Sequence, residues 1–201
     1  MSDDRRPWAR PAPYRGAAAE LWRGLCTLYL RAGGWRIAGD WPHHLPKIVL
    51  VAAPHTSNWD GVTMLAAAGY YRVPLKWMGK KELTTGPFGG LVRWAGCVPV
   101  DRSGKGDLVA DTAAQMRAAS AMVLAVAPEG TRAKSKGWKT GFYYIALAAG
   151  VPIVMSVLDW GAKTITLAGP VIASGDYAAD LTLIKAPYAG ARGKHDDRVA
   201  R

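Results

Sequence analysis

The chain has 201 residues, about half of them apolar and a fifth charged, which suits one compact domain with a sizeable core and leaves little room for a second. Its formal net charge of +11 predicts an anionic partner: a nucleic acid, a phospholipid surface or a phosphorylated small molecule. The two cysteines, Cys26 and Cys97, are far apart and form no Cys-x-x-Cys pair, so we expect neither a disulfide framework nor a structural zinc site.

The first segment of the chain, residues 1–16, combines arginines and aspartates with three prolines. Such a composition cannot bury a core, and it predicts a flexible basic N-terminus. The segment has no apolar stretch followed by a small-residue cleavage site, so a secretory signal is not indicated and we expect the protein on the cytoplasmic side of the cell membrane.

Apolar residues then recur at helical spacing from Ala17 to Ala32, interrupted by charged residues. The segment is too short and too charged for a spanning helix, which needs roughly 20 mostly apolar residues. We interpret residues 17–36 as an amphipathic helix in the membrane interface, with neighbouring arginines near anionic head groups. A helix that simply packs on the domain is the alternative, and the two are compatible. Nine Trp and eight Tyr also favour a lipid–water boundary.

Strand and helix patterns alternate through residues 37–188, which we treat as one domain. Strands are expected at Lys47–Ala53, Leu75–Gly79, Cys97–Asp101, Met122–Ala127, Val151–Leu158 and Lys163–Ala168, and helices at Gly61–Tyr71, in the later part of Thr85–Ala95, at Asp107–Ala119 and at Thr140–Gly150. This order predicts an α/β layered fold with a mostly parallel central sheet flanked by helices. Residues 189–201 are rich in charge and glycine and are expected to form a solvated tail.

A candidate catalytic pair, His55 and Asp60, follows directly on the first long strand and opens a helix. The carboxyl ends of parallel strands are where α/β sheets present ligand-binding residues. A turn over Thr56, Ser57 and Asn58 would bring the carboxylate back to the imidazole, fixing its tautomer and leaving the other nitrogen free as a base. The spacing also fits a histidine at a helix start and a first-turn acid favoured by the helix dipole.

A second cluster, Glu129-Gly130-Thr131-Arg132, also follows a buried strand. Gly130 frees the backbone to turn, and Arg132 offers a planar fork suited to phosphate. Arg102, at the end of another strand, is a candidate for the other half of a phosphate clamp. Solvated basic turns and a surface ion pair are the alternatives for these residues.

Taken in order, these segments resemble the four motif blocks of the glycerolipid acyltransferase family, which includes bacterial 1-acylglycerol-3-phosphate acyltransferases. The blocks are the His-x4-Asp run, the strand ending in Asp101-Arg102, the Pro128–Arg132 run and Val151–Val154. The run Lys80-Lys81-Glu82-Leu83 is similar to the family's linker between the first two blocks. The resemblance covers residues 47–158 and makes the main domain an acyltransferase domain.

The resemblance implies transfer of a fatty acyl group from an acyl thioester, acyl-CoA or acyl-ACP, to the hydroxyl of a lysophospholipid, most simply 1-acylglycerol-3-phosphate, in phospholipid biosynthesis. His55 would be the general base and Asp60 its orienting partner. The residues that match the acceptor-phosphate blocks are Arg102, Glu129, Gly130, Thr131 and Arg132, with Lys80 as a further candidate. Val151–Val154 would shape the site or an acyl groove. The resemblance implies no metal and no redox cofactor.

Several departures leave the acceptor open. Pro54 precedes the histidine where many members have Asn, and Met155-Ser156 stands where a second proline is frequent. A neutral lysolipid or an ornithine-type lipid is therefore an alternative acceptor. A thioesterase-like hydrolase would need the same base. A basic nucleic-acid-binding module is a different class, but the chain lacks a nucleic-acid motif, so we expect the membrane surface, the thioester donor and the lysophospholipid as partners. The expected location is the cytoplasmic face of the inner membrane, as a peripheral or monotopic protein.

Overall fold

The computed structural model describes residues 16–100, 107–134 and 137–200. The basic segment 1–15 and the predicted phosphate ligand Arg102 lie outside the described residues.

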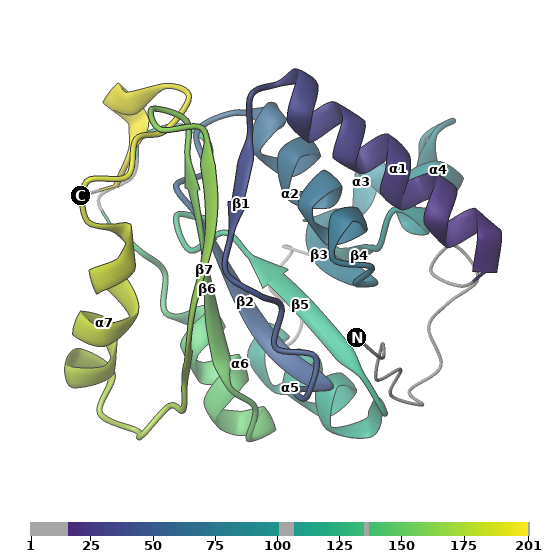
Figure 1. The fold of residues 1–201 in the computed structure, drawn as a ribbon. Coiled ribbons are helices and arrows are strands. Elements are labelled where there is room, and N and C mark those ends of the chain that lie inside the picture. The colour runs from purple at the N-terminus through teal and green to yellow at the C-terminus, as the bar shows by residue number, and fades with distance from the viewer. Residues whose placement is uncertain (1–15, 101–106, 135–136, 201) are drawn as a thin grey trace.

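A seven-stranded sheet forms the centre of the molecule (Figure 1). Its strands are β1 (Arg36–Ala38), β2 (Lys47–Ala53), β3 (Leu75–Lys80), β4 (Cys97–Val100), β5 (Met122–Val126), β6 (Ile153–Asp159) and β7 (Thr164–Val171), in the order β1-β7-β6-β2-β5-β3-β4. Every neighbouring pair is parallel except β6 and β7. The fold is thus the predicted α/β type with a mostly parallel sheet.

Helices cover both faces of the sheet, as Figure 1 shows. They are α1 (Gly16–Ala32), α2 (Asn58–Tyr70), α3 (Lys81–Thr85), α4 (Gly89–Trp94), α5 (Leu108–Ala118), α6 (Gly141–Ala149) and α7 (Tyr177–Lys185), followed by the single turns η2 (Ala186–Tyr188) and η3 (Asp196–Arg198). Helices α1 to α4 lie on one side, and α5 to α7 on the other. The three-layer arrangement buries both faces of the central strands, which explains why their sequences are nearly continuous apolar runs.

Alternate residues of β2 separate the two cores. Val49 and Val51 belong to the cluster formed with α5, α6 and α7, whereas Ile48 and Leu50 belong to the cluster formed with α2. All four side chains are buried. This packing fixes β2 at the middle of the sheet, and its carboxyl end with it.

Helix α1 is attached firmly to α2. Its residues Ala19, Cys26 and Leu30 are buried, and a Cβ on Gly69 of α2 would lie only 2.3 Å from Cys26 Sγ, so only glycine permits this close approach. An ion pair of 2.6 Å joins Glu20 to Arg72. The predicted helix is confirmed, but it ends at Ala32 rather than extending to residue 36, because the chain turns into β1. No helix in the described part of the chain is long and apolar enough to cross a bilayer.

The C-terminal region differs from the prediction. The sequence analysis missed helix α7. Its N-cap is Asp176, whose side chain accepts a hydrogen bond from Ala179 N, and the helix covers the sheet through the fully buried Ile184. Residues 189–200 do not form a solvated tail: Gly193 and Ala200 are buried, and the segment crosses the carboxyl edge of the sheet. Most charged residues of this segment are exposed, but Lys194 lies over the ring of Trp160 and the backbone of His195 bonds to Thr56.

Candidate active site

His55 and Asp60 meet at the carboxyl end of β2. His55 Nδ1 lies 3.5 Å from Asp60 Oδ2, and the imidazole keeps 26% of its surface exposed whereas the carboxylate keeps only 3%. Ser57 is the N-cap of α2: its hydroxyl accepts a hydrogen bond from Trp59 N, and Asp60 accepts one from Ser57 N in return. This reciprocal cap closes the turn between the two residues. The imidazole thus has one nitrogen facing the acid and the other facing away from it.

The Asp60 carboxylate receives hydrogen bonds from several groups. Oδ2 accepts from the amides of Thr56 (2.6 Å) and Ser57 (2.7 Å), and Oδ1 accepts from the Ser57 hydroxyl (3.1 Å) and from Trp160 Nε1 (2.7 Å). Burial works to raise the pKa of Asp60, but the hydrogen bonds from His55, Ser57, Thr56 and Trp160 together outweigh it, and the pKa lies below its usual value. The carboxylate is therefore ionised and held in one orientation.

Trp160 is a residue of this site that the sequence analysis missed. It follows β6, the strand beside β2, so its indole reaches Asp60 from the adjacent strand end. Its ring packs edge-on against Trp35 (4.9 Å between centroids), and the ammonium groups of Lys163 and Lys194 lie 4.3 and 4.9 Å from its centroid. These contacts fix the indole, and through it the carboxylate.

Glu129 supports the histidine from the other side. Its Oε1 accepts a hydrogen bond of 3.2 Å from the backbone N–H of His55, while Oε2 is buried and has no hydrogen-bond partner among the described residues. Burial raises the pKa of Glu129, opposed by the hydrogen bond from His55. This side chain, predicted as a substrate ligand, thus also joins the two loops that carry His55 and Arg132.

The loop after β5 places Arg132 over the start of α2. Gly130 has φ of +66°, a left-handed conformation that favours glycine, and its N–H closes the turn onto Ala127 O at 3.1 Å. Arg132 donates through Nη1 to the side-chain oxygen of Asn58. Thr131 is exposed, and its hydroxyl accepts from Ala133 N. Among the predicted residues of this loop, the guanidinium is the one placed to meet an anion.

A shallow pocket of about 270 Å³ lies beside the pair, lined by Thr56, Ser57, Asn58, Trp59, Arg132, His195 and Arg198. Arg198 belongs to η3 in the C-terminal segment, far from Arg132 in sequence. The segment is held here by the hydrogen bond from His195 N to Thr56 Oγ1 (3.2 Å). We call this space the basic pocket, since two guanidiniums and the N-terminus of α2 meet at it, an arrangement suited to a phosphate.

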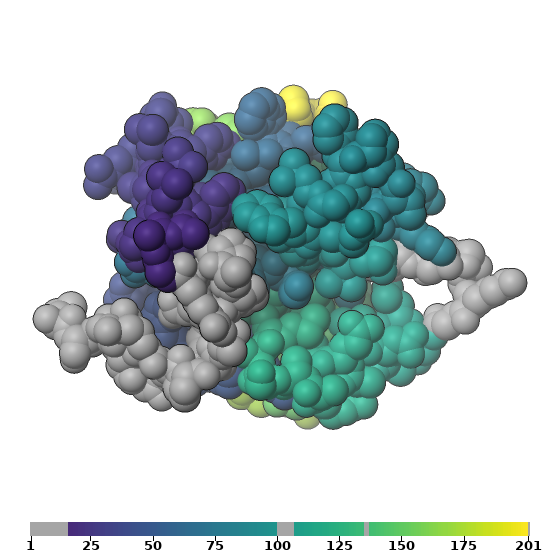
Figure 2. All heavy atoms as spheres, turned by 90° about the vertical axis from the view of Figure 1, so that its right-hand side faces the viewer, coloured from purple at the N-terminus to yellow at the C-terminus, as the bar shows by residue number. Residues whose placement is uncertain are grey.

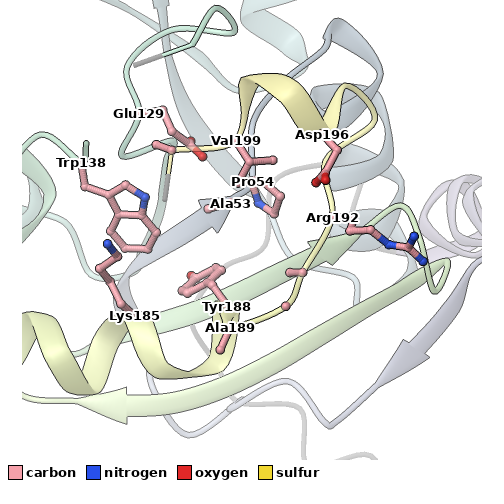
Figure 3. Close-up of a pocket in the computed structure, with 13 residues that line it drawn as sticks. Ala53, Pro54, Glu129, Trp138, Lys185, Tyr188, Ala189, Arg192, Asp196 and Val199 are labelled. Atoms are coloured by element: carbon pink, nitrogen blue, oxygen red, sulfur yellow. The ribbon is translucent and has the colours of Figure 1, made fainter. Parts of the chain in front are cut away.

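A larger, mostly apolar pocket of about 590 Å³ lies on the other side of the C-terminal segment (Figure 3). Its lining comprises Ala53, Pro54, Glu129, Trp138, Lys185, Tyr188, Ala189, Gly190, Ala191, Arg192, Asp196, Val199 and Ala200. The rings of Trp138 and Tyr188, 5.1 Å apart, form one end, and the Tyr188 hydroxyl donates to Val51 O at 2.7 Å. Pro54 and Glu129 bring this apolar pocket next to His55.

Two predicted segments are not brought to these pockets. Lys80 is exposed at the end of β3, two strands from β2, and lines neither pocket. Val151–Val154 lies at the start of β6, where Ile153 pairs with Val49 at the opposite end from His55, and it packs in the core instead of shaping a groove. In the described ranges, no group of three His, Cys, Asp or Glu residues is placed to hold a metal ion.

The chain belongs to the acyltransferase family: the family model described as Acyltransferase matches residues 41–158, which is more than half of the chain and includes the His–Asp pair and the loop after β5. The 1-acyl-sn-glycerol-3-phosphate acyltransferases of Salmonella typhimurium (strain LT2) and Escherichia coli (strain K12) are 35% and 33% identical over 108 residues, which cover 51% of this chain and 43% of each relative.

A probable 1-acyl-sn-glycerol-3-phosphate acyltransferase of Mycoplasma pneumoniae is 32% identical over 137 residues, covering 65% of this chain and 52% of that protein. The chain thus spans about half the length of these relatives, or less. The crystal structure of the 1-acyl-sn-glycerophosphate acyltransferase PlsC from Thermotoga maritima superposes with a TM-score of 0.58 at 14% identity, over 86% of this chain and 78% of that one. This likeness shows that the two proteins share a fold.

Proposed function

We propose that this protein transfers a fatty acyl group from an acyl thioester, acyl-CoA or acyl-ACP, to the free hydroxyl of 1-acylglycerol-3-phosphate. The observation that carries the proposal is the position of His55, which faces Asp60 through Nδ1 and stands between a basic pocket and an apolar one. An amphiphile with a phosphate and a hydrocarbon chain matches this pair of pockets. The names of the relatives point to the same acceptor.

In the proposed reaction, His55 Nε2 takes the proton of the acceptor hydroxyl as the oxygen attacks the thioester carbonyl. The charge that appears on the imidazole is stabilised by the Asp60 carboxylate, whose five donors leave it no freedom to turn away. The tetrahedral adduct then expels the thiolate, and the imidazolium returns the proton to the sulfur. Such a base contributes about 10²–10⁴ in rate. No covalent acyl-enzyme is needed.

The phosphate of the acceptor would bind in the basic pocket between Arg132 and Arg198. Asn58 holds the Arg132 guanidinium over the N-terminus of α2, so the fork is oriented before the ligand arrives. Arg102 remains a candidate for a third cationic contact. The hydrocarbon part of a substrate would enter the apolar pocket, where Trp138 and Tyr188 close one end.

The enzyme would act in phospholipid biosynthesis at the cytoplasmic face of the inner membrane, as a peripheral or monotopic protein. Helix α1 supports this proposal, because Leu21, Leu25 and Leu28 are 68, 53 and 64% exposed on the side turned away from α2. Amphipathic helices of this kind lie in the plane of the lipid interface, with their apolar side turned toward the acyl chains. Lipid substrates and the enzyme would then meet in the same layer.

The test is thiol release from a long-chain acyl-CoA and an acyl-ACP, measured with and without a panel of lysolipids. We expect release to depend on an acceptor and to be fastest with 1-acylglycerol-3-phosphate. His55→Ala should reduce the rate by about 10²–10⁴, whereas His44→Ala, at an exposed histidine outside both pockets, should not. Equal thiol release without any acceptor would instead identify a thioesterase, and wild-type turnover in His55→Ala would rule out the assigned base.

A further inference from the structure

A second group of exposed apolar side chains lies in α3, α4 and the turn between them, on a part of the molecule that neither pocket uses. Phe88, Leu91 and Trp94 are 75, 61 and 53% exposed, and Leu83 is 49% exposed. The spacing of Phe88, Leu91 and Trp94, three residues apart, places them along one side of α4. Side chains of this size would ordinarily be turned inward, so their exposure here needs a reason.

The hairpin of α3 and α4 is built tightly on its inner side. A Cβ on Gly89 would lie 2.2 Å from the backbone oxygen of Thr84, and Arg93 donates a hydrogen bond to that same oxygen. Trp77 of β3 anchors the end of the hairpin through a hydrogen bond of 2.9 Å from its Nε1 to Ala95 O. The exposed rings and leucines are therefore presented by a well-supported segment.

This hairpin adjoins the exposed side of α1. The rings of Trp22 and Trp94 meet edge-on, with 5.7 Å between centroids. Figure 2 shows α1 (purple) and residues 81–94 (teal) side by side on one face of the molecule. Of the fourteen large apolar residues that are exposed in the described part of the chain, seven belong to these two segments: Leu21, Leu25, Leu28, Leu83, Phe88, Leu91 and Trp94. We call these seven residues the apolar face.

The charges around the apolar face fit an anionic surface. Arg31 lies in the last turn of α1, Lys80 ends β3, Lys81 begins α3 and Arg93 lies within α4, and all four are exposed. Acidic residues are fewer in α1, α3 and α4. Glu20 is already paired with Arg72, so Glu82 is the acid that remains in these helices. Basic side chains around exposed leucines and tryptophans are the composition of segments that lie on anionic bilayers.

The apolar face also borders the edge of the sheet that carries the active site. Helix α3 starts where β3 ends, at the carboxyl edge of the sheet, and α1 leads after two residues into Trp35, which contacts Trp160. Contact of this face with lipid would thus bring the strand ends close to the bilayer. A lipid acceptor would then have a short path into the pockets.

We propose that α3 and α4 form, together with α1, one docking face for an anionic phospholipid bilayer. The inference rests on the proposed function, which requires the enzyme to reach a lipid acceptor, and extends it by assigning a lipid contact to residues 83–94. The α1 helix alone would offer a single stripe of leucines. Two supported segments define a plane, and so fix the orientation of the active site toward the bilayer.

The experiment is flotation of the full chain with phosphatidylglycerol vesicles. The double variant Phe88→Glu, Leu91→Glu should bind about tenfold more weakly or worse, because two exposed apolar groups are replaced by acids next to an anionic surface. The matched control is Ile172→Glu, Leu183→Glu, since these two side chains are 68 and 60% exposed and Leu183 lies on α7, beyond the other face of the sheet. The control should change binding less than twofold.

Equal binding of the two double variants would overturn the proposal. So would a wild-type dimer that only Phe88→Glu, Leu91→Glu dissociates, with vesicle binding unchanged, since the face would then serve a second copy of the chain. Phe88→Ser, Leu91→Ser removes the apolar area without adding charge and should also weaken binding. Thiol release with a short-chain acceptor dissolved as monomers should be unaffected in all these variants. If wild type shows no transfer at all, the proposed function fails while the vesicle result still stands.

Discussion

Trp160 Nε1 donates a hydrogen bond of 2.7 Å to Oδ1 of Asp60, a residue 100 positions earlier in the chain. Asp60 in turn faces the imidazole of His55. Trp160 lines neither pocket, so it would act on the reaction through the carboxylate rather than through the substrate. It is a positioning residue in the proposed mechanism.

Trp160→Phe keeps most of the ring packing and removes the N–H. A hydrogen bond to a charged group contributes about 1.5–3 kcal/mol, but three other donors besides His55 remain on Asp60, so we expect a fall of about three- to tenfold in kcat. KM should stay within about twofold, because the pockets are untouched. Steady-state kinetics at saturating donor would measure both. Trp41→Phe, at a buried tryptophan that lines neither pocket and whose Nε1 has no hydrogen-bond partner among the described residues, is the control and should retain wild-type kcat.

The lowered pKa of Asp60 predicts a pH dependence of stability. A carboxylate whose pKa is lower in the folded than in the unfolded state stabilises the fold above the unfolded value, about 3.9, and this contribution is lost as the pH falls through the folded pKa. In Asp60→Asn, an amide group would face the N–H groups of Thr56 and Ser57. The variant should therefore lose about 1–3 kcal/mol of unfolding free energy at pH 7.

Urea unfolding at several pH values would test this. The gap between wild type and Asp60→Asn should be largest from pH 6 to 7 and should narrow below about pH 4, where the wild-type carboxylate begins to lose its advantage. A gap of constant size down to pH 3 would contradict the assignment. Asp111→Asn, at an exposed acid of α5, should show no comparable gap.

Asp60 and Trp160 illustrate which parts of the candidate site can be predicted from the sequence and which cannot. The strand Lys47–Ala53 was predicted with the bounds it has, because its apolar run is a local signal. The approach of Asp60 to His55 also depends on a turn of a few residues. Trp160 reaches the same carboxylate only because β6 lies beside β2, which no local pattern encodes. Its position directly after a buried strand was the one available hint.

The C-terminal segment shows a second reason why the sequence did not predict part of the site. Its charged composition predicted solvation, and most of its charged groups are indeed exposed, but Gly193 and Ala200 are buried and the backbone of His195 bonds to Thr56. A few small residues change the composition of a segment very little, so the composition does not predict that they are buried. Arg198 was missed for the same reason: it belongs to the basic pocket through the path of the backbone over Thr56, not through any motif.

Arg198 and Arg132 should both act on the acceptor phosphate. We expect Arg198→Ala and Arg132→Ala each to raise KM for 1-acylglycerol-3-phosphate about tenfold, as the loss of one charge-assisted hydrogen bond implies. KM for 1-acylglycerol, which lacks the phosphate, should not change in either variant. Lys80→Ala, outside the basic pocket, should have less than a threefold effect on both acceptors. Equal effects of Arg198→Ala on the two acceptors would separate Arg198 from phosphate binding.

Gly193 sets the distance between the C-terminal segment and the active site. A Cβ at this position would lie 2.6 Å from Thr56 Cγ2 and 2.8 Å from its hydroxyl, closer than real contacts allow. Thr56 is buried, neighbours His55 and donates its N–H to Asp60, so it has little room to yield. We expect Gly193→Ala to displace the segment, to weaken the hydrogen bond from His195 N to Thr56 Oγ1, and to open both pockets that the segment separates.

The expected result for Gly193→Ala is a loss of about 1–3 kcal/mol of stability, the usual cost of an extra methyl group in a filled space, together with a several-fold rise in KM for the acceptor. Chemical denaturation and acceptor titration would measure the two effects. Gly141→Ala is the matched control, because a Cβ there meets nothing within 4 Å at the start of α6, and it should be neutral in both assays. If Gly193→Ala were equally neutral, the C-terminal segment would not be held against Thr56, and Arg198 would lose its place in the basic pocket.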